Sequence, residues 1–93
     1  MEEEENGFTI DFSGVRTEED VQDLLLDVLP LPDYYGRNLD ALYDALTEYG
    51  EGWRIELTHE EEADPDVAGY VEKTIETIED ASEEVPDLTV ERD

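Results

Sequence analysis

Three carboxylates recur one helical turn apart in the middle of the chain. Asp40, Asp44 and Glu48 stand at positions i, i+4 and i+8, so a helix places them along one stripe. Like charges at this spacing oppose helix formation by about 0.2–0.5 kcal/mol per pair. The stripe can bind a divalent cation, which prefers oxygen ligands, or the basic surface of another protein. In a chain this acidic, it can also be a solvated face that arises by chance.

Aromatic residues concentrate beside this stripe. Tyr34 and Tyr35 precede the carboxylates, and Tyr43 and Tyr49 lie among them. Aromatic anchors next to charges are typical of the residues that dominate protein–protein interfaces. Gly36 leaves a backbone surface that a partner can approach closely, although a turn explains it equally well. We expect part of this aromatic set to belong to the core, Tyr43 and Tyr49 first.

Other residues able to do chemistry are scarce. His59 is the one histidine, lies in an acidic run and is expected to face solvent near a helix start. The chain has no cysteine, which excludes disulfides and thiolate metal sites. It carries no nucleophile motif and no glycine-rich phosphate loop. Carboxylates at i and i+4 are not an EF-hand loop, so we expect only adventitious metal binding there. We predict no enzymatic activity, no cofactor and no resident metal.

The net charge limits the classes of partner that this chain can bind. Thirty acidic residues against five basic ones give −25, which excludes nucleic acid because phosphate binding needs cations. No apolar run is long enough to span a membrane, and the N-terminus is acidic where a signal peptide is basic. We therefore expect a cytoplasmic protein, and a monomer. Two interpretations of the charge stay open: the solvated surface of a salt-adapted protein, and an acidic face for a basic partner.

The 93 residues suit one domain. We interpret residues 1–7 as a disordered acidic leader and residues 8–93 as a single folded domain. Segments that alternate apolar and polar residues predict strands, and apolar stripes with capping residues predict helices. The expected strands are 8–12, 53–58 and 87–91, and the expected helices start at Thr17, Asn38 and Asp64 and end before Pro30, Gly50 and Pro86.

Strands that alternate with helices indicate crossover connections and a parallel sheet. All three strands alternate, so one sheet face is expected to be apolar and the other wet. With every helix on one face, right-handed crossovers give the strand order 1-2-3. The sequence therefore predicts a two-layer α/β domain.

The segment Leu31-Pro32-Asp33-Tyr34-Tyr35-Gly36, followed by Asn38-Leu39-Asp40-Ala41-Leu42 and Asp44, closely resembles the signature of the barstar family. The resemblance extends over most of the chain in the order of its elements. It implies a barstar-like fold and an intracellular inhibitor, or immunity protein, of a secreted ribonuclease. In such inhibitors the loop and the second helix plug the cationic active site of the enzyme.

The resemblance also assigns partner-binding positions. They are Tyr34, Gly36, Asn38, Leu39, Asp40, Tyr43 and Asp44, with Asp44 expected in a phosphate subsite of the enzyme, then Tyr49 at the end of the same helix, and Asp80 and Glu84 on the last helix. The chain departs from the best-known member at several of these places. Tyr43 and Tyr49 replace tryptophans, Asp80 replaces a glutamate, and Arg37 puts a cation where an acid is usual. The alternatives are a module of the same fold for another basic protein, and a scaffold with no present partner.

Overall fold

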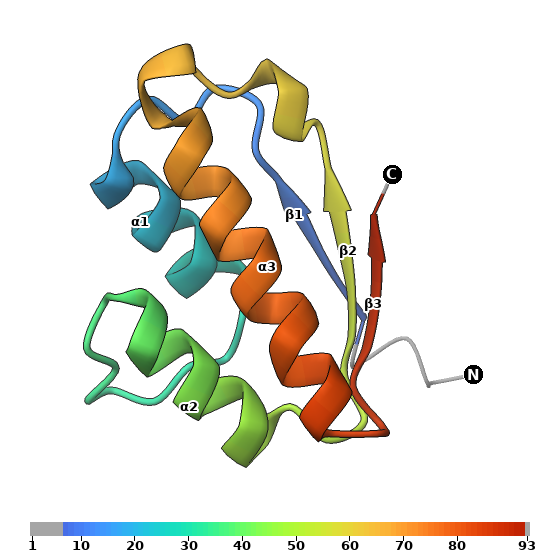
Figure 1. Cartoon of the computed structure of the whole chain (residues 1–93). Helices are drawn as coiled ribbons and strands as arrows, with labels where there is room; N and C mark the ends of the chain where they lie inside the picture. The colour runs from blue at the N-terminus through green and yellow to red at the C-terminus, as the bar shows by residue number, and fades with distance from the viewer. Residues whose placement is uncertain (1–6, 93) are drawn as a thin grey trace.

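The computed structural model describes residues 7–92, which form a three-stranded sheet with helices packed on one face (Figure 1). The strands are β1 (Gly7–Asp11), β2 (Arg54–Thr58) and β3 (Thr89–Arg92). They run parallel in the order β1-β2-β3, with Phe8 opposite Ile55 and Ile55 opposite Val90. The predicted two-layer α/β architecture and its strand order are confirmed.

One face of the sheet is apolar, as the alternation predicted. Ile10, Ile55 and Leu57 point into the core, whereas Thr9 and Glu56 lie on the opposite, exposed face. A parallel sheet is usually covered on both faces by its crossover helices. Within residues 7–92, all the helices lie on one side of the sheet, which leaves the other face uncovered by helices (Figure 1).

The helices are α1 (Glu18–Val28), α2 (Leu39–Tyr49) and α3 (Ala68–Glu84). Thr17 caps α1 by accepting the Asp20 amide at 3.0 Å, and the Asp20 carboxylate accepts the amide of Arg16. Two short 3-10 turns, η2 (Glu60–Glu62) and η3 (Pro65–Val67), precede α3. The helix predicted to start with Asp64 as its cap therefore begins as a 3-10 turn, in which the Asp64 side chain accepts the amide of Asp66.

The core lies between the sheet and the helices. The apolar stripe predicted for the last helix is buried, at Val67 in η3 and at Val71, Ile75 and Ile78 in α3. Helix α3 contacts both α1 and α2 as well as β3, so it is the central helix of the layer. The helices contribute further fully buried side chains, among them Val21, Leu25, Leu42 and Leu46.

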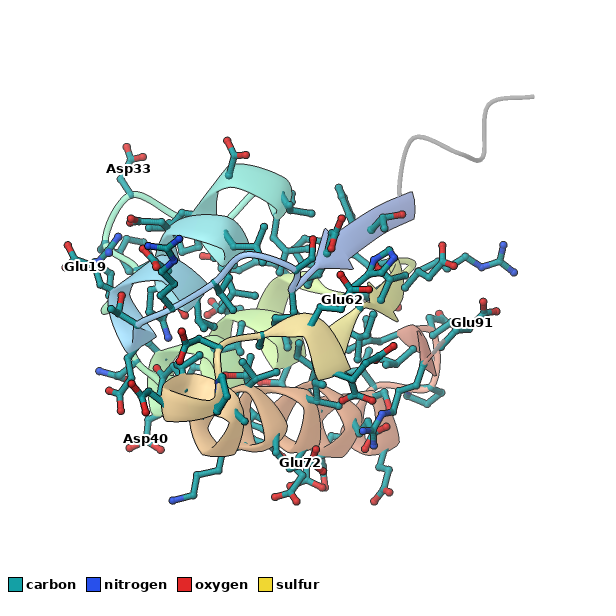
Figure 2. All side chains as sticks on the ribbon, turned by 90° about the horizontal axis from the view of Figure 1, so that it is seen from above. Glu19, Asp33, Asp40, Glu62, Glu72 and Glu91 are labelled. Atoms are coloured by element: carbon teal, nitrogen blue, oxygen red, sulfur yellow. The ribbon has the colours of Figure 1, made fainter. Side chains whose placement is uncertain are left out.

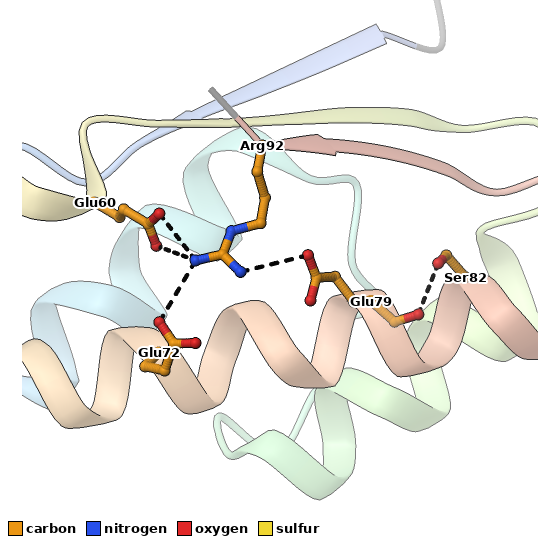
Figure 3. Close-up of polar contacts among 5 residues, drawn as sticks. All are labelled: Glu60, Glu72, Glu79, Ser82 and Arg92. Carbon is orange, nitrogen blue, oxygen red and sulfur yellow. Dashed lines mark hydrogen bonds and ion pairs between the residues drawn. The ribbon is translucent and has the colours of Figure 1, made fainter.

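Arg92, the last residue of β3, forms hydrogen bonds and ion pairs with carboxylates of η2 and α3 (Figure 3). Its guanidinium donates to both carboxylate oxygens of Glu60 at 2.8 and 2.9 Å, and lies 3.5 Å from Glu72 and 3.7 Å from Glu79. The hydrogen bond to Glu60 is the largest of the effects that raise the pKa of Arg92. One cation thus offsets the repulsion among three carboxylates from η2 and α3. Ser82 donates to the backbone oxygen of Glu79 beside this cluster.

The boundaries of the elements differ slightly from the predicted ones. β1 already begins at Gly7, which the sequence assigned to the leader, and residues 1–6 of that leader lie outside the described residues. His59 is exposed and precedes η2, as expected, and it adopts a left-handed backbone with φ 58°. Within residues 7–92, no helix has both the length and the apolar composition that crossing a membrane requires.

Candidate protein-binding site

Loop 31–37 is fixed to the helices by a buried polar network. The hydroxyl of Tyr35 donates to the side-chain oxygen of Gln22 at 2.7 Å, and it also reaches the Asn38 carbonyl at 3.3 Å. The amide nitrogen of Gln22 donates in turn to the hydroxyl of Tyr70 at 2.7 Å. Because these groups are shielded from water, their hydrogen bonds hold the loop against α1 and α3 in one arrangement.

The buried tyrosine is not one of the two that the sequence favoured. Tyr35 is only 9% exposed, whereas Tyr49 is 41% exposed, so the prediction that Tyr49 belongs to the core is wrong. Tyr43 is half-buried and packs against the core, in partial agreement with the expectation. Tyr35 can be buried because its hydroxyl finds a hydrogen-bond acceptor in the interior, the side-chain oxygen of Gln22. A buried tyrosine needs such a partner for its hydroxyl.

The Tyr35 network predicts a loss of stability in alkali. Burial raises the pKa of the Tyr35 hydroxyl to about 12, against about 10 in an unfolded chain. The folded state therefore keeps its proton longer, and this stability is intact below pH 10 and lost as the pH rises through about 12. The difference between the folded and the unfolded pKa of Tyr35 corresponds to roughly 2–3 kcal/mol in the free energy of unfolding. Urea unfolding between about pH 8 and 12 checks this: Tyr35→Phe flattens the fall, and parallel profiles for wild type and variant contradict it.

Helix α2 starts where the loop ends. The side-chain oxygen of Asn38 accepts the amide of Ala41 at 2.7 Å and so caps the helix, while its nitrogen donates to the Gly36 carbonyl at 3.3 Å. Arg37 has a left-handed backbone, with φ 57°, and its guanidinium donates to Asp23 on α1 at 2.8 Å. The cation at this unusual position therefore turns toward α1.

Gly36 is exposed, and neither the backbone nor the packing around it requires a glycine. A Cβ built there would lie 3.4 Å from the Cβ of Ala41 and 3.6 Å from Asn38, which is ordinary contact. Gly50 at the end of α2 contrasts with it, because a Cβ there would lie 2.4 Å from the Leu46 carbonyl oxygen. Gly50 is thus explained by local packing, whereas Gly36 leaves an uncovered stretch of backbone within loop 31–37.

A hollow of about 260 Å³ opens between the loop and α2, and we call it the tyrosine hollow. Tyr34 and Tyr49 line it, and their hydroxyls hydrogen-bond to each other. Tyr34 is 73% exposed, which is unusual for so large an aromatic ring. Two carboxylates, Asp44 and Glu48, line the same hollow, as does Gly36. The tyrosine hollow therefore combines aromatic walls, exposed backbone and negative charge.

The acidic stripe of α2 faces solvent. Asp40, Asp44 and Glu48 are all exposed, as their spacing predicted. Figure 2 shows Asp40 pointing outward, and labelled carboxylates elsewhere, such as Glu72 and Glu91, do the same on other sides. Across residues 7–92, no three His, Cys, Asp or Glu side chains are placed to hold a metal ion together.

The remaining predicted residues Leu39, Tyr43, Asp80 and Glu84 do not line the tyrosine hollow. Tyr43 sits near α3: burial is the largest cause that raises its pKa, followed by the charges of Glu84, Asp80 and Asp44. Asp80 and Glu84 of α3 thus act electrostatically on Tyr43 of α2. Leu39 is half-buried and packs against the core, so its main contact lies within the domain.

Sequence reasoning missed two contributors. Glu48 was recognised in the stripe but not counted among the binding positions, although its spacing of four residues from Asp44 was the available signal. Gln22, which holds Tyr35, is buried and adjoins the apolar stripe of α1. A single glutamine in that place carries no sequence signal, because surface helices hold many such residues.

These observations define the class of protein: a small acidic α/β domain that presents tyrosines and carboxylates on one loop and one helix. The family model described as "Barstar (barnase inhibitor)" matches residues 6–92. A Bacillus subtilis (strain 168) protein named "Putative ribonuclease inhibitor YrdF" is 39% identical over 82 residues, which cover 83% of this chain and 82% of the relative. The chain belongs to the barstar family, and the resemblance seen in its sequence is confirmed.

Proposed function

We propose that this chain inhibits a small basic ribonuclease by covering its active site with loop 31–37 and α2. The observation that carries the proposal is the tyrosine hollow, where Tyr34 and Tyr49 stand beside the carboxylates of Asp44 and Glu48. Exposed aromatic rings supply contact area, and carboxylates complement a cationic phosphate-binding site. Membership of the barstar family and the name of the Bacillus relative support a ribonuclease as the partner.

The proposal assigns roles to the individual groups. Asp44 and Asp40 take the place of substrate phosphates, and the exposed backbone at Gly36 allows the enzyme to approach closely. Asp80 and Glu84 add charge at the rim, near Tyr43. The inhibitor itself turns over no substrate. We propose further that it acts as a monomer in the cytoplasm, as an immunity protein protecting the cell that makes the enzyme.

The direct test is inhibition of RNA hydrolysis by a panel of small basic microbial ribonucleases. At least one enzyme is expected to lose activity in proportion to added inhibitor and to reach full inhibition at a one-to-one ratio. The chain alone is expected to hydrolyse no RNA. An unrelated protein of similar size and charge is the control for diffuse attraction.

Two results would count against the proposal. Equal inhibition by the acidic control means that charge alone is responsible. Absence of inhibition across the panel, together with tight one-to-one binding to a basic protein that is not a nuclease, assigns the same surface to the alternative module.

A further inference from the structure

The exposed ring of Tyr34 is held from across the tyrosine hollow. Tyr34 belongs to loop 31–37, and Tyr49 is the last residue of α2, fifteen positions later. Both rings line the hollow, and the bond between their hydroxyls joins the loop wall to the helix wall. The hydrogen bond therefore restrains a ring that is otherwise largely surrounded by solvent.

Tyr49 is the better anchored of the two. It is 41% exposed against 73% for Tyr34, and it stands in a regular helix. The backbone just after it is also fixed, because the buried Gly50 donates its amide to the Leu46 carbonyl at 2.9 Å. Both side chains have the same two rotatable bonds, but Tyr34 lies in a loop and is more exposed, so it has more freedom to lose on binding.

We propose that Tyr49 is a positioning residue, whose hydroxyl holds the Tyr34 ring at the tyrosine hollow in the free protein, so that the binding surface is formed before a partner arrives. Its effect on affinity rests on the proposed function, whereas its effect on the free protein does not. A surface ordered in advance loses less conformational entropy in the complex, and this increases affinity without any new contact.

The protonation of Tyr49 supplies a readout specific to this bond. The hydrogen bond to Tyr34 is the largest cause that raises the pKa of Tyr49 to about 12, followed by burial and by the negative charge of Glu48. Tyr34→Phe removes the first cause and keeps the other two. The Tyr49 midpoint is then expected to fall toward about 10 without reaching it.

The first experiment uses the free protein with labelled tyrosine rings, observed residue by residue in NMR spectra. In Tyr49→Phe, which keeps the ring and removes the hydroxyl, the Tyr34 ring becomes mobile on the nanosecond scale. In Tyr34→Phe, the Tyr49 midpoint falls. Tyr43→Phe, which removes a hydroxyl of α2 outside the hollow, changes neither readout. An equally ordered Tyr34 ring in Tyr49→Phe overturns the proposal, and so does an unchanged Tyr49 midpoint in Tyr34→Phe.

The second experiment measures binding to the ribonuclease that the wild-type chain inhibits. Loss of one hydrogen bond predicts affinity about three- to tenfold weaker for Tyr49→Phe and for Tyr34→Phe. The double variant is expected to be no weaker than either single variant, because both remove the same bond. Additive losses mean that each hydroxyl contacts the partner separately, and unchanged affinity means that order in the free state is irrelevant to binding; both overturn the proposal. If wild type inhibits no ribonuclease, the proposed function fails and the free-protein experiment alone decides the role of Tyr49.

Discussion

Replacing Asp44 by alanine is expected to weaken the ribonuclease complex at least a hundredfold and to leave the domain folded. Asp44 is exposed, lines the tyrosine hollow and stands one turn from both Asp40 and Glu48. Removing it from the free protein relieves two like-charge pairs of about 0.2–0.5 kcal/mol each, so stability is unchanged or slightly higher. In the proposed complex, the carboxylate would be desolvated against cations of the enzyme, and its loss would leave those cations unpaired.

Losing one member of such a buried pair costs about 2–5 kcal/mol or more, and the charge pairs of the barnase–barstar complex are a known example of this effect. At about 1.4 kcal/mol per factor of ten, the hundredfold loss expected here corresponds to about 2.8 kcal/mol, and the upper end of the range corresponds to roughly 4,000-fold. Most of the loss is expected in the dissociation rate, because contacts buried in an interface act chiefly there. Asp40→Ala is expected to follow closely, since Asp40 lies one turn away on the same stripe.

The measurement pairs binding kinetics with melting curves on the same variants. Glu61→Ala is the matched control: Glu61 is an exposed carboxylate in η2, remote in sequence from the site. Glu60 serves less well, because it binds Arg92 and its removal disturbs the cluster that secures β3. If Glu61→Ala weakens binding as much as Asp44→Ala does, the attraction is diffuse. If Asp44→Ala unfolds the domain, the carboxylate is structural.

Raising the salt concentration from about 0.05 to 2 M KCl is expected to raise the melting temperature by roughly 10 °C or more. The reason is repulsion within the helices, where carboxylates four residues apart recur. These pairs are Glu19/Asp23, Asp23/Asp27, Asp40/Asp44, Asp44/Glu48, Glu72/Glu76, Glu76/Asp80, Asp80/Glu84 and Glu79/Glu83. At about 0.2–0.5 kcal/mol each, they oppose folding by roughly 2–4 kcal/mol. For a domain of this size, 1 kcal/mol shifts the midpoint by about 4–8 °C.

Screening removes much of this repulsion, since the Debye length falls from about 10 Å at 0.1 M to about 3 Å at 1 M salt. Thermal unfolding followed by circular dichroism gives the midpoint at each concentration. A variant carrying Asp40→Asn, Asp44→Asn and Glu48→Gln lacks the α2 pairs, so it is expected to start from a higher midpoint and to gain less. A midpoint that stays level or falls with salt removes the basis for reading this surface as salt-adapted. Salt is expected to act in the opposite direction on the complex, because it screens attraction between partners.

The local pattern of the sequence predicted the fold well, because strands and helix ends are each specified by residues close together in the chain. The alternation of apolar and polar residues predicted the strands. Thr17 and Asn38 were predicted to cap two helices, and both do so. The departures occur where a contact joins distant positions. Nothing near Gln22 in the sequence indicates that its amide bonds to both Tyr35 and Tyr70, and periodicity alone cannot decide which tyrosine of a crowded set is buried.

In the candidate site, too, the features set by local sequence were predictable and those set by contacts between distant residues were not. The spacing of Asp40, Asp44 and Glu48 was enough to place them together on the exposed side of α2. The contact of Tyr34 with Tyr49 depends on how loop 31–37 turns back toward the end of α2. The loop is closed by the bond from the Tyr35 amide to the Pro32 carbonyl and held to α1 by the bond from the Tyr35 hydroxyl to Gln22, a long-range contact that the sequence does not indicate.

Each strand of this sheet pairs with a strand tens of residues away, since Gly7 lies opposite Arg54 and Arg54 lies opposite Thr89. Such non-local pairings form slowly during folding, because a long loop must close before any contact stabilises it. In that interval, strand edges are unpaired and available to other chains. The charge of −25 makes half-folded chains repel one another through this slow step. Carboxylates that destabilise the finished helices thus keep the chain free of aggregates until its sheet has closed.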